Sequence, residues 1–264
     1  MSTTVERIPL LIPPTGTENP VGDSVLCRAV THRGLVRLHN EDAFCVLSKE
    51  NRHLFAVADG LGGHRGGGIA SEIAVDTVKS EFEKWNGKGK ERFVVRAIER
   101  ANQEVFSTSQ SHPELLNMQT TATVVALEKD TLAIGHVGDC RLYRVRNGQI
   151  VTITKDHSQA AELLRLRLIS KKDAPNHPGR HQLTRSVGSS PFLRVDLIKE
   201  KTNFGDSLIL CSDGLWSELD PLDIRDALLD ENIEKSLEQM VGMVLKAGAP
   251  DNLTAVIFRV GQYN

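Results

Sequence analysis

The chain has 264 residues, a formal net charge of -2 and 40% hydrophobic residues, which is enough for a domain with a sizeable buried core. The near-neutral charge gives no basic surface for nucleic acid or anionic membrane. No run approaches the roughly 18 apolar residues that a membrane span needs, and the N-terminal segment lacks the pattern of a secretory signal. We therefore expect a cytoplasmic protein. The cysteines stand singly, with no C-x-x-C pair, and are expected to be buried small residues.

The first part of the chain divides into an arm and two strands. Residues 1–22 contain four prolines and no sustained periodicity, so we expect a flexible arm in front of a folded domain over 23–264. Strands are expected near 26–31 and 43–48. Between them lies THRGLVRLHNED, a concentrated polar cluster where the fold needs only a turn. A solvated acidic loop explains such a string equally well.

The stretch HLFAVADGLGGHRGGG at 53–68 leads an apolar strand into a glycine-dense turn and places Asp59 at the strand end. An ordinary Asp-Gly turn is the simplest interpretation of this residue pair. A dinucleotide-binding G-x-G-x-x-G that starts at Gly60 would need glycine where Arg65 stands, and no Gly-Lys-Ser or Gly-Lys-Thr follows. Both nucleotide-binding motifs are therefore excluded, and the meaning of Asp59 depends on the other carboxylates.

The rest of the chain alternates between helical and strand patterns. Helices are expected near 69–85, 94–105, 221–229 and 233–246. A β-meander is expected from Thr120, with Asn147-Gly148 as a two-residue hairpin turn, and further strands at VDLIKE, SLILC and the C-terminus. The polar segment 155–187 is only weakly helical, and we interpret it as a surface insertion of the kind that borders a site.

Carboxylates recur at the ends of these strands. They are Asp42, Asp59, Asp139, Asp213 and Asp251. Carboxylates gathered at one rim repel one another and lose solvation, so they persist only where a cation neutralises them. An all-oxygen donor set favours Mg²⁺ or Mn²⁺. Two such ions bridged by one carboxylate would hold a water, lower its pKa and direct it at phosphorus, while Arg37 would bind the phosphate oxygens. The pattern thus indicates a phosphate-ester hydrolase without a protein nucleophile.

The chain resembles the metal-dependent protein phosphatases of type 2C (the PPM family) in their compact bacterial form. The matching strings are GLVRLHNEDA at 34–43, VADGLGGH at 57–64, TTATVV at 120–125, GHVGDCRLYR at 135–144, KDHS…HPGRHQLTRSVGS from 155 to 189, LILCSDGLW at 208–216 and PDNLT at 250–254. They follow the family's order and span about 26–260. The resemblance implies an α+β fold, a four-layer α-β-β-α sandwich of two antiparallel sheets flanked by helix pairs, with the metals at one end.

The resemblance also implies a set of metal ligands. Asp59 would bridge two ions, with the Gly60 carbonyl beside it, and Asp213 and Asp251 would complete the protein ligands of the first. Glu41 and Asp42 would support the second ion, directly or through water. Asp139 resembles the residue that holds a third, weaker ion in bacterial members.

The resemblance also implies roles for other residues, and at some positions this chain differs from the family. Arg37 resembles the phosphate-binding arginine, and the 155–187 insertion resembles the flap beside the active site, which is thought to influence substrate choice. Leu61 stands where many eukaryotic relatives have a histidine proposed as general acid, so His64 or a metal-bound water are the candidates here. Cys140 replaces a serine, which would place a thiol open to metal inactivation near the site.

The activity implied is that of a protein serine/threonine phosphatase using two Mn²⁺ or Mg²⁺ ions and a possible third. A water or hydroxide that bridges two ions would attack the phosphorus of phosphoserine or phosphothreonine, with Asp59, Arg37, Asp213 and Asp251 as the catalytic set. Alternatives are a catalytically silent phosphoprotein-binding adaptor of the same fold, or a phosphatase dedicated to one regulator, such as an anti-sigma-type or secretion-system component. The retained metal aspartates disfavour the adaptor. We expect phosphorylated proteins and a cognate Ser/Thr protein kinase as partners, no nucleic acid or membrane, and a monomer.

Overall fold

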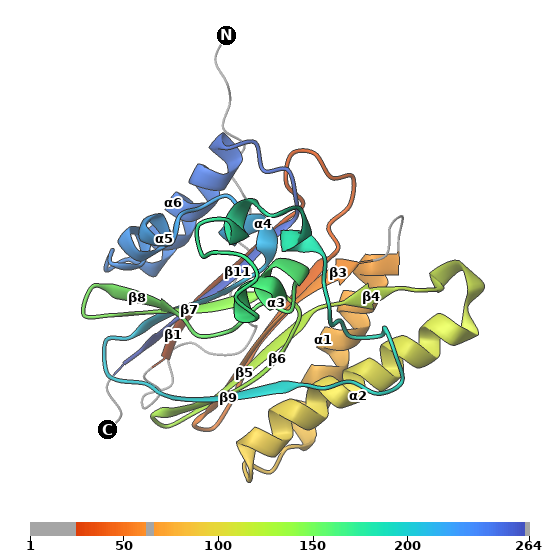
Figure 1. Cartoon of the computed structure of the whole chain (residues 1–264). Helices are drawn as coiled ribbons and strands as arrows, with labels where there is room; N and C mark the ends of the chain where they lie inside the picture. Colours follow the sequence, from red (N-terminus) through yellow and green to blue (C-terminus); the bar gives the residue numbers. More distant parts are fainter. Residues whose placement is uncertain (1–24, 62–65, 262–264) are drawn as a thin grey trace.

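The computed structural model describes residues 25–61 and 66–261, whose strands form two antiparallel sheets packed face to face (Figure 1). The strands are β1 (Val25–His32), β2 (Asp42–Lys49), β3 (Arg52–Leu61), β4 (Gln119–Thr120), β5 (Ala122–Glu128), β6 (Thr131–Val137), β7 (Arg141–Arg146), β8 (Gln149–Thr152), β9 (Asp196–Lys201), β10 (Ser207–Cys211) and β11 (Leu253–Val260). One sheet has the order β1-β11-β10-β7-β8, and the other has β2-β3-β5-β6-β9, with β4 paired to β3.

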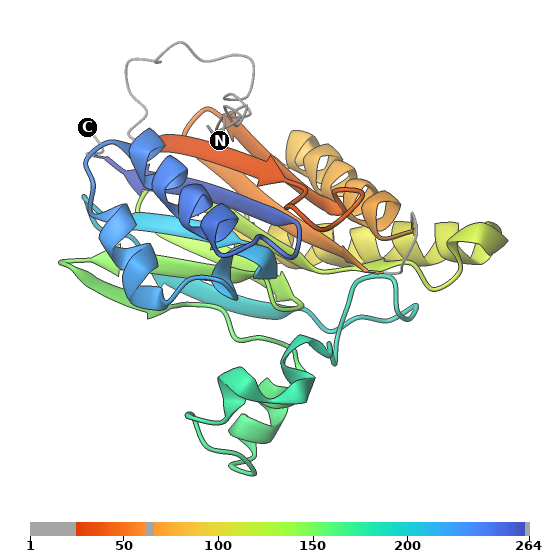
Figure 2. The same ribbon diagram turned by 90° about the horizontal axis from the view of Figure 1, so that it is seen from above.

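Helices cover the outer face of each sheet, and shorter helices lie in the loops. They are α1 (Gly66–Lys84), α2 (Lys90–Ser111), η1 (Pro113–Leu115), α3 (Gln159–Arg165), η2 (Ala174–Asn176), η3 (Pro178–His181), α4 (Asp213–Trp216), α5 (Pro221–Leu228) and α6 (Ile233–Lys246). The pair α1 and α2 packs on the β2 sheet, whereas α5 and α6 pack on the β1 sheet (Figures 1 and 2). The predicted four-layer α-β-β-α sandwich is confirmed.

The core follows from the apolar spacing in the sequence. In α2, Val94, Ala97, Ile98 and Ala101 follow the i, i+3, i+4, i+7 spacing of one helix face and are fully buried against the sheet. The space between the sheets is filled by alternate strand residues, including Phe55 and Phe258, whose rings stack with centroids 4.0 Å apart. The helix and strand patterns expected from the sequence therefore correspond to the actual packing faces.

The predicted hairpin turn is confirmed, and the structure describes the segment that was expected to be a surface insertion. Asn147 and Gly148 have φ angles of 51° and 73° and connect β7 to β8, the geometry that a two-residue hairpin turn requires. The 155–187 segment, which we call the flap, leaves the sandwich after β8 and projects away from it before β9 (Figure 2). Its base is tied to the sandwich by a bridge between Thr120 and Val187.

The topology gathers the carboxylate positions at one end of the sandwich. In the β2–β3 pair Asp42 lies opposite Asp59, and β11 begins opposite the end of β1, with His32 paired to Leu253. The expected arm over 1–22 lies outside the described residues. Within the described part of the chain, no helix has the length and apolar character required to cross a membrane.

Candidate functional site

A pocket of about 510 Å³ opens at this end of the sandwich. Predicted site residues that line it are Arg37, Glu41, Asp59, Gly60, Asp139, Asp213 and Asp251. They come from the β1–β2 loop, the end of β3, the β6–β7 turn, the start of α4 and the loop before β11, so segments far apart in sequence converge here. His64, the expected proton donor, lies outside the described residues.

Asp42 lies beside the pocket lining rather than in it. It pairs with Asp59 across the strands, and its Oδ2 accepts a hydrogen bond from the Ser212 hydroxyl at 2.7 Å. Its other oxygen, Oδ1, is buried without a partner, and so is Oε1 of Glu41. Because a buried carboxylate oxygen without a partner is costly, these two atoms fit the presence of a cation. The donor set at the pocket therefore suits the metal ions that the resemblance implies.

The carboxylates perturb one another electrostatically. Burial raises the pKa of Asp42 to about 7, with the Asp213 charge acting in the same direction. Burial also raises the pKa of Asp59 well above its usual range, followed by repulsion from Asp42 and Asp213. The pKa of Asp139 is raised by burial and then by Asp213. A divalent cation would reverse these effects, because it favours the ionised form of every carboxylate around it.

Close backbone contacts explain the Asp-Gly pairs at the site. A Cβ on Gly60 would lie 2.2 Å from the carbonyl oxygen of Gly67, and one on Gly214 would lie 1.9 Å from that of Asn252. Any side chain at either position would therefore push apart the segments that carry the carboxylates. Glycine after Asp59 and Asp213 lets these segments meet at the rim.

Arg37 reaches the mouth of the pocket from the β1–β2 loop. Its Nη2 donates to Oδ2 of Asp251 at 2.7 Å, and its side chain is half exposed. This hydrogen bond is the main cause of the raised pKa of Arg37. A guanidinium has five N–H donors in a planar fork, so it can bind phosphate oxygens at this rim with two parallel hydrogen bonds. The structure thus places Arg37 beside the predicted metal ligands.

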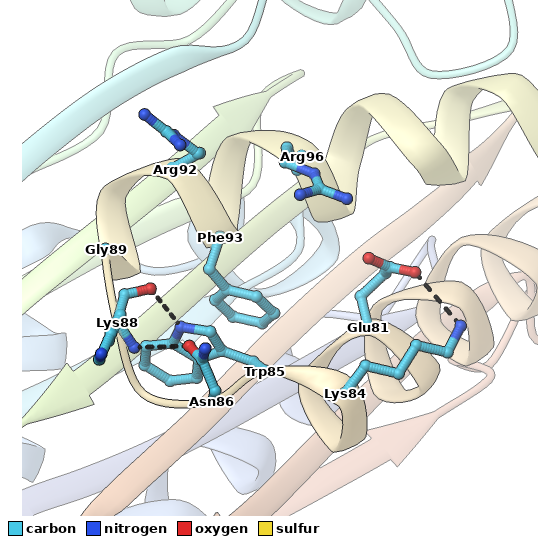
Figure 3. A pocket seen from close by; sticks show the side chains of 9 residues that line it. All are labelled: Glu81, Lys84, Trp85, Asn86, Lys88, Gly89, Arg92, Phe93 and Arg96. Carbon is cyan, nitrogen blue, oxygen red and sulfur yellow. Dashed lines mark hydrogen bonds and ion pairs between the residues drawn. The ribbon is translucent and has the colours of Figure 1, made fainter.

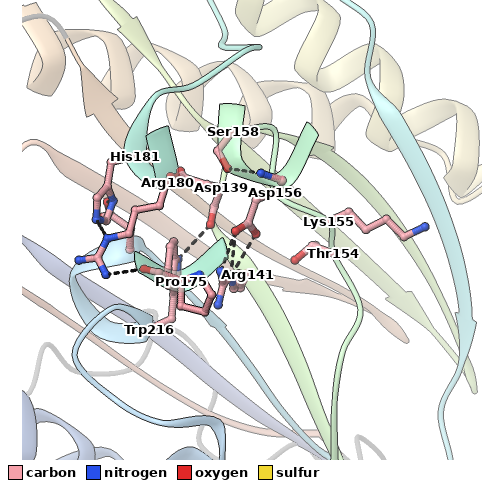
Figure 4. Close-up of polar contacts among 12 residues, drawn as sticks. Asp139, Arg141, Thr154, Lys155, Asp156, Ser158, Pro175, Arg180, His181 and Trp216 are labelled. Atoms are coloured by element: carbon pink, nitrogen blue, oxygen red, sulfur yellow. Dashed lines mark hydrogen bonds and ion pairs between the residues drawn. The ribbon is translucent and has the colours of Figure 1, made fainter. Parts of the chain in front are cut away.

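The flap contributes residues that the sequence analysis did not single out. Arg180, His181 and Leu183 line the pocket. His181 Nδ1 lies 3.1 Å from Oδ2 of Asp213. Arg180 Nε donates to His181 Nε2 at 2.7 Å (Figure 4). Potential ligand atoms of Asp139, His181 and Asp213 all lie within 4.8 Å of one another. Because Nε2 of His181 accepts from Arg180, Nδ1 carries the proton of the neutral ring and can donate to Asp213, beside the predicted carboxylate ligands.

The side chains of Trp216 and Arg141 hold the turn that carries Asp139 (Figure 4). The Trp216 indole N–H donates to the Asp139 carbonyl at 3.0 Å, and the Arg141 guanidinium lies 3.5 Å from the centroid of the Trp216 ring. Arg141 is itself held by Asp156, to which its Nε and Nη2 donate at 3.0 and 2.7 Å. A cation over an indole face is favourable, so this stack fixes the turn that carries Asp139.

Cys140 follows Asp139 and is fully buried. Its Sγ lies 3.2 Å from the Thr121 hydroxyl, and burial, followed by the charge of Asp59, raises its pKa well above the usual range. Burial therefore disfavours the thiolate of Cys140, which is the form that binds metals. Cys45 and Cys211 are buried as expected, whereas Cys27 is only partly buried.

A second pocket, of about 470 Å³, lies at the turn between α1 and α2 (Figure 3). Trp85 and Phe93 stack there with centroids 4.6 Å apart. Its charged residues are mainly basic, with Glu81 the one carboxylate among the lining residues. This pocket has neither the clustered carboxylates nor the predicted residues of the first. The acidic pocket is therefore the candidate active site.

Comparisons with known proteins agree with this choice. Residues 32–257 match the family model described as protein phosphatase 2C. A serine/threonine phosphatase, stp, of Listeria welshimeri is 34% identical over 233 residues, which cover 86% of this chain and 92% of the relative.

Solved structures give the same result. Serine/threonine phosphatase Stp1 from Staphylococcus aureus has a TM-score of 0.86 at 30% identity, covering 94% of this chain and 99% of that one. The catalytic domain of the serine/threonine protein phosphatase PstP, described in complex with 2 manganese ions, has a TM-score of 0.80 at 28% identity, covering 90% and 99%. With its motifs in order and its fold shared, the chain belongs to the protein phosphatase 2C family.

Proposed function

We propose that this chain is a metal-dependent protein serine/threonine phosphatase. The observation that carries the proposal is the convergence of Asp59, Asp213, Asp251 and Asp139 on one pocket with Arg37 at its mouth. The relatives are named serine/threonine phosphatases, and a related structure is described with two manganese ions, which supports the same activity and cofactor here. The reaction is hydrolysis of the phosphate ester of phosphoserine or phosphothreonine.

The predicted metal ligands fall into three groups, one for each ion. Asp59, the Gly60 carbonyl, Asp213 and Asp251 would hold one Mn²⁺ or Mg²⁺. Glu41 and Asp42 would support a second ion, sharing Asp59, and their unpartnered buried oxygens favour this assignment. Asp139, with Asp213, would hold a third. When bound, such ions supply a water of lowered pKa at neutral pH and neutralise charge on the phosphoryl group.

The protein's own residues bind and orient the phosphate. Arg37 would exchange its hydrogen bond to Asp251 for phosphate oxygens, because a dianionic phosphate is the stronger partner for a half-exposed guanidinium. Bound in this way, the phosphate would lie beside the carboxylates that line the pocket and would hold the ions. His64 as the proton donor stays a prediction.

The finer assignments belong to the same proposal. We assign residues 23–264 to one phosphatase domain, because strands from Val25 to Val260 share its two sheets, with 155–187 as its flap and 1–22 as an arm. Phosphorylated proteins are the proposed substrates. A cognate Ser/Thr kinase, a monomeric state and a cytoplasmic location remain predictions, which co-purification, analytical ultracentrifugation and cell fractionation test.

The proposal is tested with the purified chain on p-nitrophenyl phosphate and a phosphothreonine peptide, with EDTA, Mg²⁺ or Mn²⁺. We expect turnover that requires the metal and is lost in Asp213→Asn, with the folded state checked by circular dichroism. Asp226→Asn is the matched control, because Asp226 is exposed on α5 and pairs only with its neighbour Arg225 among the described residues. No turnover of either substrate, with metal bound, would favour the phosphoprotein-binding adaptor. Turnover that EDTA does not affect would overturn the metal mechanism.

A further inference from the structure

The loop that carries Arg37 exposes three large apolar side chains. Leu35, Val36 and Leu38 have exposed fractions of 62%, 68% and 82%. The loop lies between β1 and β2, beyond the strand ends at the end of the sandwich where the pocket opens (Figure 1). Contiguous exposed apolar side chains beside a site commonly mark an interaction surface. We call these three residues the rim patch.

The loop is held rigidly by the residue that follows a metal ligand. The side-chain amide of Asn252 donates to the Arg33 carbonyl at 2.8 Å and to the His39 carbonyl at 2.9 Å, so it ties both ends of the loop. Gly34 has φ of 77°, and a Cβ there would lie 2.2 Å from the carbonyl oxygen of Asp251. The rim patch is therefore presented by a fixed loop, and its exposure is a property of the folded site.

Position and charge indicate what covers the rim patch. Arg37 lies between Val36 and Leu38 in the sequence and lines the catalytic pocket. A polypeptide whose phosphate binds Arg37 therefore brings the residues next to its phosphorylated side chain close to this loop. Residues 31–40 contain no carboxylate, and their fixed charges are those of Arg33 and Arg37. The side chains that the loop exposes on either side of Arg37 are apolar, so they leave water only when apolar groups cover them. The complementary occupant is an apolar segment that flanks the phosphate.

We propose that the rim patch is a docking surface for apolar residues next to the phosphoserine or phosphothreonine of protein substrates. This inference rests on the proposed function and adds a substrate class to it. Contact with apolar neighbours would remove Leu35, Val36 and Leu38 from water, which stabilises the bound peptide without touching the reacting atoms. The apolar contact should therefore lower KM and leave kcat unchanged.

The test compares two phosphothreonine peptides, one flanked by leucine and valine and one flanked by serine and aspartate. p-Nitrophenyl phosphate, which has no flanking residues, is the reference substrate. The wild type should favour the apolar peptide by about ten-fold in kcat/KM, the discrimination typical of an apolar contact. In the double variant Leu35→Ser/Leu38→Ser, this preference should fall to about two-fold or less, mainly through KM. Leu222→Ser is the control, because Leu222 is 53% exposed but lies on α5.

The outcomes separate this inference from the proposed function. Loss of the apolar preference in the double variant, with the control unchanged, supports the docking role of the rim patch. A wild type that hydrolyses p-nitrophenyl phosphate and both peptides equally would overturn the rim patch alone. A wild type that hydrolyses none of the three with metal present would overturn the proposed function. A wild-type dimer in analytical ultracentrifugation that becomes monomeric in the double variant would assign the patch to a second copy and also overturn the inference.

Discussion

Asn252 is the residue whose replacement tests the architecture of the site most sharply. It is 5% exposed, and its side chain makes three hydrogen bonds across the rim. The backbone N–H of Glu41 donates to its Oδ1 at 2.8 Å, and its Nδ2 donates to the carbonyls of Arg33 and His39 at 2.8 and 2.9 Å. At about 1 kcal/mol for each bond, Asn252→Ala should lower the free energy of unfolding by about 3 kcal/mol.

The assay is urea unfolding followed by circular dichroism, in EDTA so that metal affinity does not contribute. Asn86→Ala is the matched control, because the Asn86 side chain accepts a single bond, from the Lys88 N–H at 3.1 Å, in an exposed turn. It should cost about 1 kcal/mol or less. A loss in Asn252→Ala below about 1 kcal/mol, or equal to that of the control, would refute the claim that Asn252 ties the rim together.

Three further predictions concern charge at the pocket. In the metal-free protein the pKa of Asp42 is raised to about 7, so the folded state binds this proton more tightly than the unfolded state, and the stabilisation is lost as pH rises toward 7 and above. Mn²⁺ binds the ionised carboxylates, so the increase in Tm that Mn²⁺ causes should become larger between about pH 5.5 and 8. An increase in Tm that does not change with pH, measured in thermal scans, would contradict this. Asp42→Asn should be more stable than wild type in EDTA at about pH 8, yet bind Mn²⁺ roughly ten-fold or more weakly by calorimetry, and a destabilised metal-free variant would argue against repulsion at the rim. Arg37→Ala should raise KM for a phosphothreonine peptide at least about ten-fold while leaving Mn²⁺ affinity within a few-fold, and an unchanged KM would exclude Arg37 from phosphate binding.

Much of the fold was predictable because its signals are local. The spacing of apolar residues marked α2 and α6, and Asn147-Gly148 marked the β7–β8 turn, since its backbone needs positive φ at both residues. The strand-end positions of Asp59 and Asp213 were also evident from the sequence. That these carboxylates meet at one pocket followed only from the family resemblance, because convergence depends on contacts between distant segments.

Other parts of the site carried no local signal. His181 reaches Asp213 from the end of the short helix η3 in the flap, and such short turns have no periodicity that the sequence would reveal. Asn252 looked like one more polar residue before a strand, although its side chain joins two ends of a loop more than 200 positions earlier in the chain. The resemblance implied that Asp42 supports a metal, but the sequence could not show that Asp42 lies beside the pocket lining, opposite Asp59 in the β2–β3 pair and hydrogen-bonded to Ser212.

The most direct test of the central claim compares wild type with Asp59→Asn in two measurements on the same samples. Isothermal titration calorimetry gives the number of Mn²⁺ ions bound, and phosphate release from a phosphothreonine peptide gives the turnover. The account predicts at least two ions in the wild type, loss of one or more in the variant, and a fall in kcat of about 100-fold or more with the fold intact. A variant that keeps both its Mn²⁺ ions and its turnover would contradict the assignment of Asp59 as the shared ligand of the catalytic centre.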